Sequence, residues 1–228
     1  AQLRRDTQDN YPAPLAILCA VYEGTQLPID SALAVEAMHF GPLLAGPVAR
    51  NLMRTLFVNR GAALRRKGSD AYVNAAYVAR LNARYVEECR ALRAEGASPA
   101  LVANAAKQAG LASIPPCGEP AESDHVAKPA TPAQAAETGQ RLLSVIALEA
   151  VRCLEEGVVA DPVQADLGSV LGLGYPDWTG GALSYVETIG LAAFVGRCDL
   201  LAAQYGERYR PTAGLRQRAQ ADAPFHDR

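Results

Sequence analysis

The chain has 228 residues, which is enough for one large domain or two small ones with a buried core. Half of its residues are hydrophobic, 20% are charged and the formal net charge is −2, so composition gives no electrostatic case for nucleic acid or an anionic membrane as partner. No apolar run approaches the roughly 20 residues that span a bilayer, and the first residues lack a signal-peptide core.

The cysteines are scattered singly along the chain. They are Cys19, Cys89, Cys117, Cys153 and Cys198. An odd number without a C-x-x-C pair argues against a disulfide framework and against a zinc site. We therefore expect a reducing, cytoplasmic setting and no bound metal.

Residues 1–66 are predicted to hold two or three helices. The apolar residues Val48, Leu52 and Leu56, with Met53 and Phe57, recur at helical spacing on one face and predict a helix. The segment leads into a basic cluster formed by Arg60, Arg65, Arg66 and Lys67.

Residues 70–112 are predicted to form a long helix and a shorter one. The apolar face of the long helix comprises Val78, Leu81, Tyr85, Cys89 and Leu92. Gly96 stands where this helix is expected to stop. Residues 115–130 have the closely spaced prolines of a linker.

Residues 131–228 are predicted to hold the last helices and a polar tail. Thr131 and Asp161 each precede a proline and stand three residues before a glutamine, a pattern typical of helix starts. Gly157 is expected to end the helix that begins at Thr131. No stretch of alternating β-branched residues is present, so the sequence predicts an all-α fold.

Two segments resemble each other. In the first the matching residues are Glu88, Leu92, Glu95-Gly96, Pro99, Asn104 and Gly110-Leu111; in the second they are Glu149, Cys153, Glu156-Gly157, Pro162, Asp166 and Gly172-Leu173. A helix–Gly–Pro-helix–Gly unit used twice predicts a pseudo-twofold domain in which each copy buries the apolar face of the other.

Residues 141–190, which end in Tyr185-Val186-Glu187-Thr188-Ile189-Gly190, are similar to the second repeat of the helical C-terminal domain of 3-hydroxyacyl-CoA dehydrogenases. Residues 11–63 resemble the helices that end the enoyl-CoA hydratase module in the multifunctional fatty-acid β-oxidation proteins. The resemblance implies a two-repeat helical dehydrogenase C-terminal-like domain over 70–228 (repeat one 70–112, linker 115–130, repeat two 131–228), preceded by hydratase-linker-like helices over 1–66.

The family uses NAD, but this sequence lacks the G-x-G-x-x-G fingerprint that binds it. The nearest string, Gly172-Leu173-Gly174, is predicted to end a helix, so it cannot put a helix N-terminus on a pyrophosphate. His39-Phe40-Gly41-Pro42 mimics the context of the family's catalytic histidine by chance. We therefore expect no catalytic residue and no cofactor in this chain.

The resemblance offers a small set of candidate substrate-facing residues. They are Asn74, Gly174, Tyr175, Trp178, Gly180 and Gly181. For the glycines the alternative is helix-end geometry and tight packing, and for Asn74 it is a surface position on a helix. Glu149, Glu155 and Glu156 are expected to be solvated, and neither His125 in the linker nor His226 in the tail is expected to act as a base.

The resemblance implies a helical module of fatty-acid β-oxidation that is non-catalytic alone, a pseudoenzyme with interaction or acyl-CoA-facing roles. Expected partners are a second copy or a β-oxidation enzyme subunit, with acyl-CoA as a candidate ligand and with neither nucleic acid nor a membrane span. The alternative is a 3-hydroxyacyl-CoA dehydrogenase or enoyl-CoA hydratase part completed by a separate or missing segment. An unrelated helical adaptor is a third reading.

Overall fold

The computed structural model describes residues 2–67, 73–111, 114 and 131–226, and these residues form helices and turns without a strand. The all-α fold is therefore confirmed. The helices are α1 (Gln2–Thr7), α2 (Pro12–Gly24), α3 (Ile29–Ala45), α4 (Pro47–Leu52), α5 (Arg60–Lys67), α6 (Ala75–Ala94), α7 (Pro99–Gln108), α8 (Pro132–Glu155), α9 (Pro162–Leu167), α10 (Ala182–Ile189), α11 (Leu191–Tyr205) and α12 (Ala213–Ala221). The π-helical turns η1 (Met53–Asn59) and η3 (Gly168–Leu173) and the 3₁₀ turns η4 (Asp177–Thr179) and η5 (Glu207–Tyr209) connect them.

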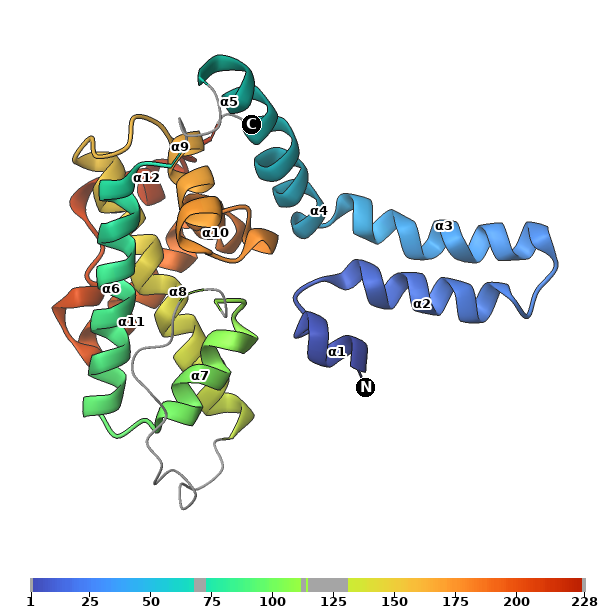
Figure 1. The fold of residues 1–228 in the computed structure, drawn as a ribbon, viewed down its shortest axis with the longest axis horizontal. Coiled ribbons are helices and arrows are strands. Elements are labelled where there is room, and N and C mark those ends of the chain that lie inside the picture. The colour runs from blue at the N-terminus through green and yellow to red at the C-terminus, as the bar shows by residue number, and fades with distance from the viewer. Residues whose placement is uncertain (1, 68–72, 112–113, 115–130, 227–228) are drawn as a thin grey trace.

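Helix α8 is the centre of the core. It begins at a capping box, in which the Thr131 side chain accepts from the Gln134 backbone while the Gln134 side chain binds the Thr131 N–H, as the sequence predicts. All residues from 141 to 151 are buried, because α6, α7, α9 and α10 pack around this helix. Figure 1 shows these helices, with α11 and α12, as one body.

The helix–Gly–Pro-helix unit occurs twice around this core. Helices α6 and α8 each run into a glycine of positive φ, Gly96 (95°) and Gly157 (73°), as predicted. Ser98 and Asp161 then cap α7 and α9 through their side chains. The predicted apolar face of α6 is confirmed for Leu81, Tyr85, Cys89 and Leu92, which are at most 3% exposed. The division into domains over 1–66 and 70–228 stays a prediction, and the linker 115–130, with Cys117 and His125, lies outside the described residues.

The N-terminal segment has more helices than the sequence predicts. Instead of two or three, five helices and the turn η1 fill residues 2–67, because prolines divide the apolar stretch. Pro12 and Pro47 stand in the first turns of α2 and α4, and Pro28 precedes α3. Helices α2 and α3 form a hairpin that projects away from the body, while α4 leads back to it (Figure 1).

In this segment the apolar side chains are more exposed than two polar ones. Met53 and Phe57 are 57% and 80% exposed, whereas the polar residues Asn51 and Thr55 are each 1% exposed. Helical spacing marks which residues share a face, but the polar face is the one that meets the body of this protein. The apolar face is only partly covered, because Val48, Leu52 and Leu56 are half-buried.

Among the described residues, no single helix is both long and apolar enough to cross a bilayer. The pair formed by Ile29–Ala45 and Pro47–Arg65 meets the length and composition limits together, with a bend of 57° between its halves.

Candidate functional site

The loop between α9 and α10 contains most of the residues predicted to face a ligand. It starts at Gly174, which ends η3 with a φ of 90°, and it closes on Gly180 and Gly181, whose φ values are 80° and 118°. These are conformations that an L side chain rarely adopts, so the glycines are required by the path of the backbone. The loop returns the chain sharply to the start of α10.

Asp166 at the end of α9 lies under this return. Its carboxylate accepts hydrogen bonds from the backbone N–H groups of Leu183 (2.8 Å) and Ser184 (3.3 Å) and from the Ser184 hydroxyl. An acidic group at a helix N-terminus satisfies the free N–H groups and interacts favourably with the helix dipole. A Cβ on Gly181 would lie 2.5 Å from that of Asp166, so only glycine fits this contact.

The other loop residues pack inward. Tyr175 is 1% exposed, donates its hydroxyl to the Leu143 carbonyl at 3.2 Å, and meets the Tyr185 ring edge-on. Burial raises the pKa of Tyr175 well above its usual value. Trp178 is partly exposed, and its indole N–H is buried without an acceptor among the described residues.

Asn74 is the remaining candidate, and its amide is used by the backbone. The side-chain oxygen accepts from the Tyr77 N–H at 3.1 Å and so caps α6, while the side-chain nitrogen donates to the Val158 carbonyl at 2.8 Å. The structure therefore brings the five loop residues together and gives Asn74 hydrogen bonds to other segments. A ligand-facing role for the six residues stays a prediction.

A charged cluster next to the loop was missed by the sequence reading. The side chain of His226, expected only as part of a polar tail, is 7% exposed and lies between two carboxylates. Its Nε2 is 3.2 Å from Asp166 Oδ2, and its Nδ1 is 3.1 Å from Glu187 Oε2. Burial acts to lower the pKa of His226, but the two carboxylates outweigh it and raise the pKa to about 9. No signal in the sequence pairs residue 226 with residues 166 and 187.

Glu187 connects the C-terminal tail and the segment around Arg54 to this cluster. Its carboxylate accepts from the backbone N–H groups of Phe225 (2.6 Å) and His226 (2.8 Å) and forms an ion pair with Arg54 at 3.5 Å. Burial acts to raise the pKa of Glu187, but His226 and Arg54 hold it below its usual value.

The segment from α4 to η1 docks on the same loop and on α10 through polar contacts. Thr55 donates its hydroxyl to the Gly180 carbonyl at 2.7 Å, Asn51 donates to the Thr188 hydroxyl at 3.1 Å, and Arg54 donates to the Ser184 hydroxyl at 2.6 Å. These three contacts explain why the polar face of this segment is the buried one.

The arrangement of the cluster is not that of an activated nucleophile. Ser184 is fully buried and donates to Asp166, while His226 contacts Asp166 and Glu187. A nucleophilic hydroxyl needs the base as its own hydrogen-bond partner. Within the described ranges, no group of three or more His, Cys, Asp or Glu side chains is arranged to hold a metal ion.

The loop glycines also do not fit NAD. Gly172 and Gly174 lie at the C-terminal end of a helical segment, whereas a pyrophosphate needs a helix N-terminus. Helix α10 does begin after two glycines, but the Asp166 carboxylate already takes that position. A phosphate and the Asp166 carboxylate would repel each other there. The N-terminus of α10 therefore binds a carboxylate of the protein where a dinucleotide site would bind phosphate.

Two reciprocal ion pairs join α6 and α8. Arg80 on α6 binds Glu149 on α8 at 2.5 Å, and Arg141 on α8 binds Glu88 on α6 at 2.5 Å. The two arginines are as far apart in sequence as the two glutamates, so the pairs are related by the repeat. The expectation that Glu149 is solvated is wrong, because it is 2% exposed and surrounded by arginines.

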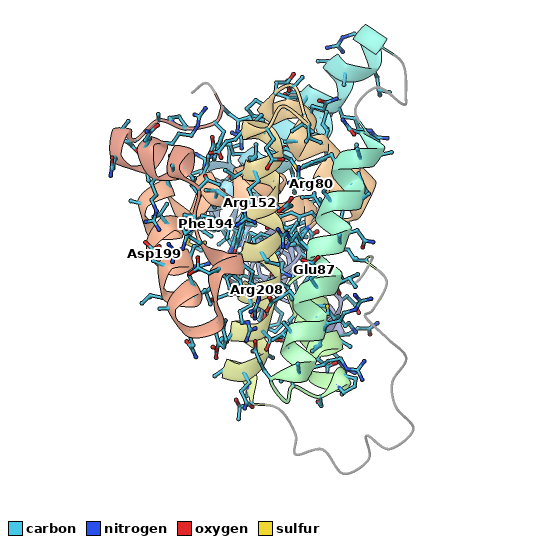
Figure 2. The ribbon with its side chains drawn as sticks, turned by 90° about the vertical axis from the view of Figure 1, so that its left-hand side faces the viewer. Arg80, Glu87, Arg152, Phe194, Asp199 and Arg208 are labelled. Atoms are coloured by element: carbon cyan, nitrogen blue, oxygen red, sulfur yellow. The ribbon has the colours of Figure 1, made fainter. Side chains whose placement is uncertain are left out.

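Each repeat adds a second carboxylate to its ion pair. Glu95 binds Arg141 at 2.7 Å, and Glu156 at the corresponding position binds Arg80. Arg208 of η5 also binds Glu88 and Glu95, at 2.6 Å and 2.8 Å. Figure 2 shows Arg80, Arg152 and Arg208 along the seam between the two helices.

No family model matches the chain. Among curated proteins, the "Fatty acid oxidation complex subunit alpha" of Shewanella halifaxensis (strain HAW-EB4) is 38% identical over 98 residues, which is 43% of this chain and 14% of the relative. The protein of the same name from Pseudomonas savastanoi pv. phaseolicola is 45% identical over 80 residues, 35% of this chain and 11% of the relative. The matched region is therefore well under a fifth of the length of these relatives. These matches confirm the resemblance: over 80 to 98 of its residues, the chain is similar to proteins named fatty acid oxidation complex subunit alpha.

Proposed function

We propose that this chain is a non-catalytic helical module of fatty-acid β-oxidation that acts through protein–protein interaction. The main support for the proposal is that polar groups around the glycine loop already bind other groups of the protein. Asp166 caps α10, Glu187 and His226 hold the tail, and the buried ring of Tyr175 fills the core. These groups are engaged in holding the fold and leave little to bind or activate a substrate.

The proposal includes a partner and a setting. The relatives are named as subunits of a complex, which supports assembly with a β-oxidation enzyme subunit or with a second copy. The free thiols of Cys19, Cys153 and Cys198 support a reducing, cytoplasmic setting. Under this proposal the candidate loop residues, from Gly174 to Gly181, have a packing role and acyl-CoA is not a ligand.

The test uses Trp178, the only tryptophan of the chain, which lies in the loop. Tryptophan fluorescence is followed during titration with NADH and then with acetoacetyl-CoA. We expect no saturable change with either ligand, and no rise in melting temperature, because a ligand that binds only the folded state would stabilise it. Saturable binding of NADH at micromolar concentration would contradict the proposal and favour a dehydrogenase part completed by another segment.

A further inference from the structure

The α2–α3 hairpin lacks the burial that a stable helix pair needs. Helices α1, α2 and α3 contain no buried residue. Hydrogen bonds from Asn10 to the Gln108 carbonyl and from Tyr11 to Asp177 attach the base of the hairpin to the body. Beyond this base the two helices pack on each other and extend outward (Figure 1). Helices of this length are marginal in water without tertiary packing, so this surface needs a partner.

One face of the hairpin is a shallow apolar groove. Its cavity of about 450 Å³ is lined in part by the small residues Ala20, Gly24 and Ala32. Large apolar side chains also line it, at helical spacing: Ile17, Val21, Ile29, Leu33 and Phe40. Leu18 and Leu44 continue this face, three or four residues from Val21 and Phe40. The same face therefore carries a groove and large side chains beside it, and these side chains could enter the same groove of a second copy.

The exposed area fits a specific interface. The seven large side chains of this face are each between 55% and 71% exposed. With roughly 180 Å² for a large side chain, they expose about 750 Å² together, close to the ~800 Å² that each partner buries in an interface of standard size. Isolated apolar patches on monomers are smaller than this.

The charge of the hairpin favours a protein as the occupant. The segments 12–24 and 29–45 contain no Lys or Arg, and their charged groups are Glu23, Asp30, Glu36 and the titratable His39. Glu23 and His39 contact each other at 3.3 Å within the hairpin. Helices that lie on membranes carry Lys and Arg for the anionic lipid surface, and this pair has none.

We propose that two copies of the chain pair face to face through the α2–α3 hairpin and form a four-helix bundle around a twofold axis. A twofold interface uses the same patch on both partners, which requires a self-complementary surface. The groove and its flanking ridges meet that requirement, and two hairpins provide the four helices of a standard bundle. This inference deepens the proposed interaction role by naming its surface and its partner.

The test is the mass of the full chain in solution, measured by size-exclusion chromatography with light scattering. The wild type is expected to be a dimer at micromolar concentration. Leu33→Glu and Leu33→Lys, at an exposed position in the groove, are each expected to be monomeric, with the helical circular dichroism of the body retained. An equimolar mixture of the two variants is expected to recover the dimer mass, because the introduced charges then attract. The Val21→Glu and Val21→Lys pair repeats the test at a second position.

Leu200→Glu is the matched control, since Leu200 is 74% exposed but lies on α11 in the body; it is expected to remain dimeric. A monomeric wild type would overturn the pairing, as would a dimer that survives both Leu33 variants or a mixture that stays monomeric. A monomer that sediments with phosphatidylcholine vesicles would also overturn it, in favour of a lipid surface. NADH binding, in contrast, would refute the proposed function and leave the dimer unaffected.

Discussion

At the scale of single residues, the close approach of Gly181 to Asp166 determines how α10 begins. The carboxylate reaches the N–H groups of Leu183 and Ser184 only because no side chain separates it from the loop. The φ of 118° at Gly181 adds a second requirement for glycine. The glycine pair can be identified from the sequence. The sequence does not show whether the backbone approaches a ligand or a carboxylate of the protein itself.

Gly181→Ala is therefore expected to destabilise the protein by more than about 2 kcal/mol, because the positive φ is strained and the new Cβ would overlap Asp166. Urea denaturation followed by circular dichroism measures the loss. Gly196→Ala is the control: Gly196 lies within α11 with no atom within 4 Å of its Cβ position. That change should stabilise the helix by up to about 1 kcal/mol. Equal effects at the two glycines would show that the contact with Asp166 is unimportant.

At the scale of elements, the seam between α6 and α8 combines an apolar core with buried charge. Leu81 and Leu142 are fully buried there, and the arginine–glutamate pairs lie along the same interface. Buried ion pairs contribute little net stability compared with apolar packing, but removing one partner leaves an uncompensated charge. Reciprocal pairs also favour one register, since a shift of one helix along the other would break both.

Glu88→Gln is expected to reduce the free energy of unfolding by about 3 kcal/mol, because Arg141 and Arg208 would lose a carboxylate that is fully buried. Glu87→Gln, one residue earlier on α6, removes a carboxylate that is 55% exposed and paired with Arg84. That loss should be below about 1 kcal/mol. Chemical denaturation of both variants makes the comparison, and a similar small loss for Glu88→Gln would mean that the arginines find other partners.

At the scale of the whole molecule, the cluster at His226 connects three distant parts of the chain. The ring joins the C-terminal tail to Asp166 on α9 and to Glu187 on α10, and Arg54 joins the N-terminal helices to Glu187. The charged groups that face the ring are the two carboxylates, so it is held in its protonated form. Stability of the whole fold should therefore depend on the charge of one histidine.

The pKa of His226 is about 9 in the folded protein, against a usual value of 6.5. A raised pKa stabilises the fold when the ring is protonated in both states, so the contribution is complete below pH 6.5 and is lost as pH rises through 9. It amounts to about 3 kcal/mol for a difference of this size. The measurement is the free energy of unfolding of wild type minus that of His226→Gln between pH 6 and pH 10.

The difference between the two proteins separates His226 from other groups that titrate at high pH, such as the thiols of Cys153 and Cys198, whose pKa values burial raises to about 11 and about 12. A difference that does not change with pH would show that the pKa of His226 is the same in the folded and unfolded states. A difference that grows with pH would contradict the sign of the effect.

The sequence by itself determined the local structure of this protein. Capping residues such as Thr131 and Asp161, stop glycines such as Gly96, and the apolar stripe of α6 act within a few residues of where they stand. Their effects can therefore be read without knowing what lies opposite. The family motif was readable for the same reason, since it consists of helix ends and loop glycines in a fixed order.

Only the tertiary structure decided which faces meet. Glu149 lies in an apolar stripe and is buried because α6 supplies arginines, and His226 is buried because two carboxylates from other helices reach it. Asn51 and Thr55 are buried while Phe57 is exposed, since the glycine loop offers a carbonyl and α10 offers hydroxyls to that face. A charge or an amide can be buried only where a partner pairs with it. The periodicity of one helix does not show which residues, distant in sequence, will supply that partner.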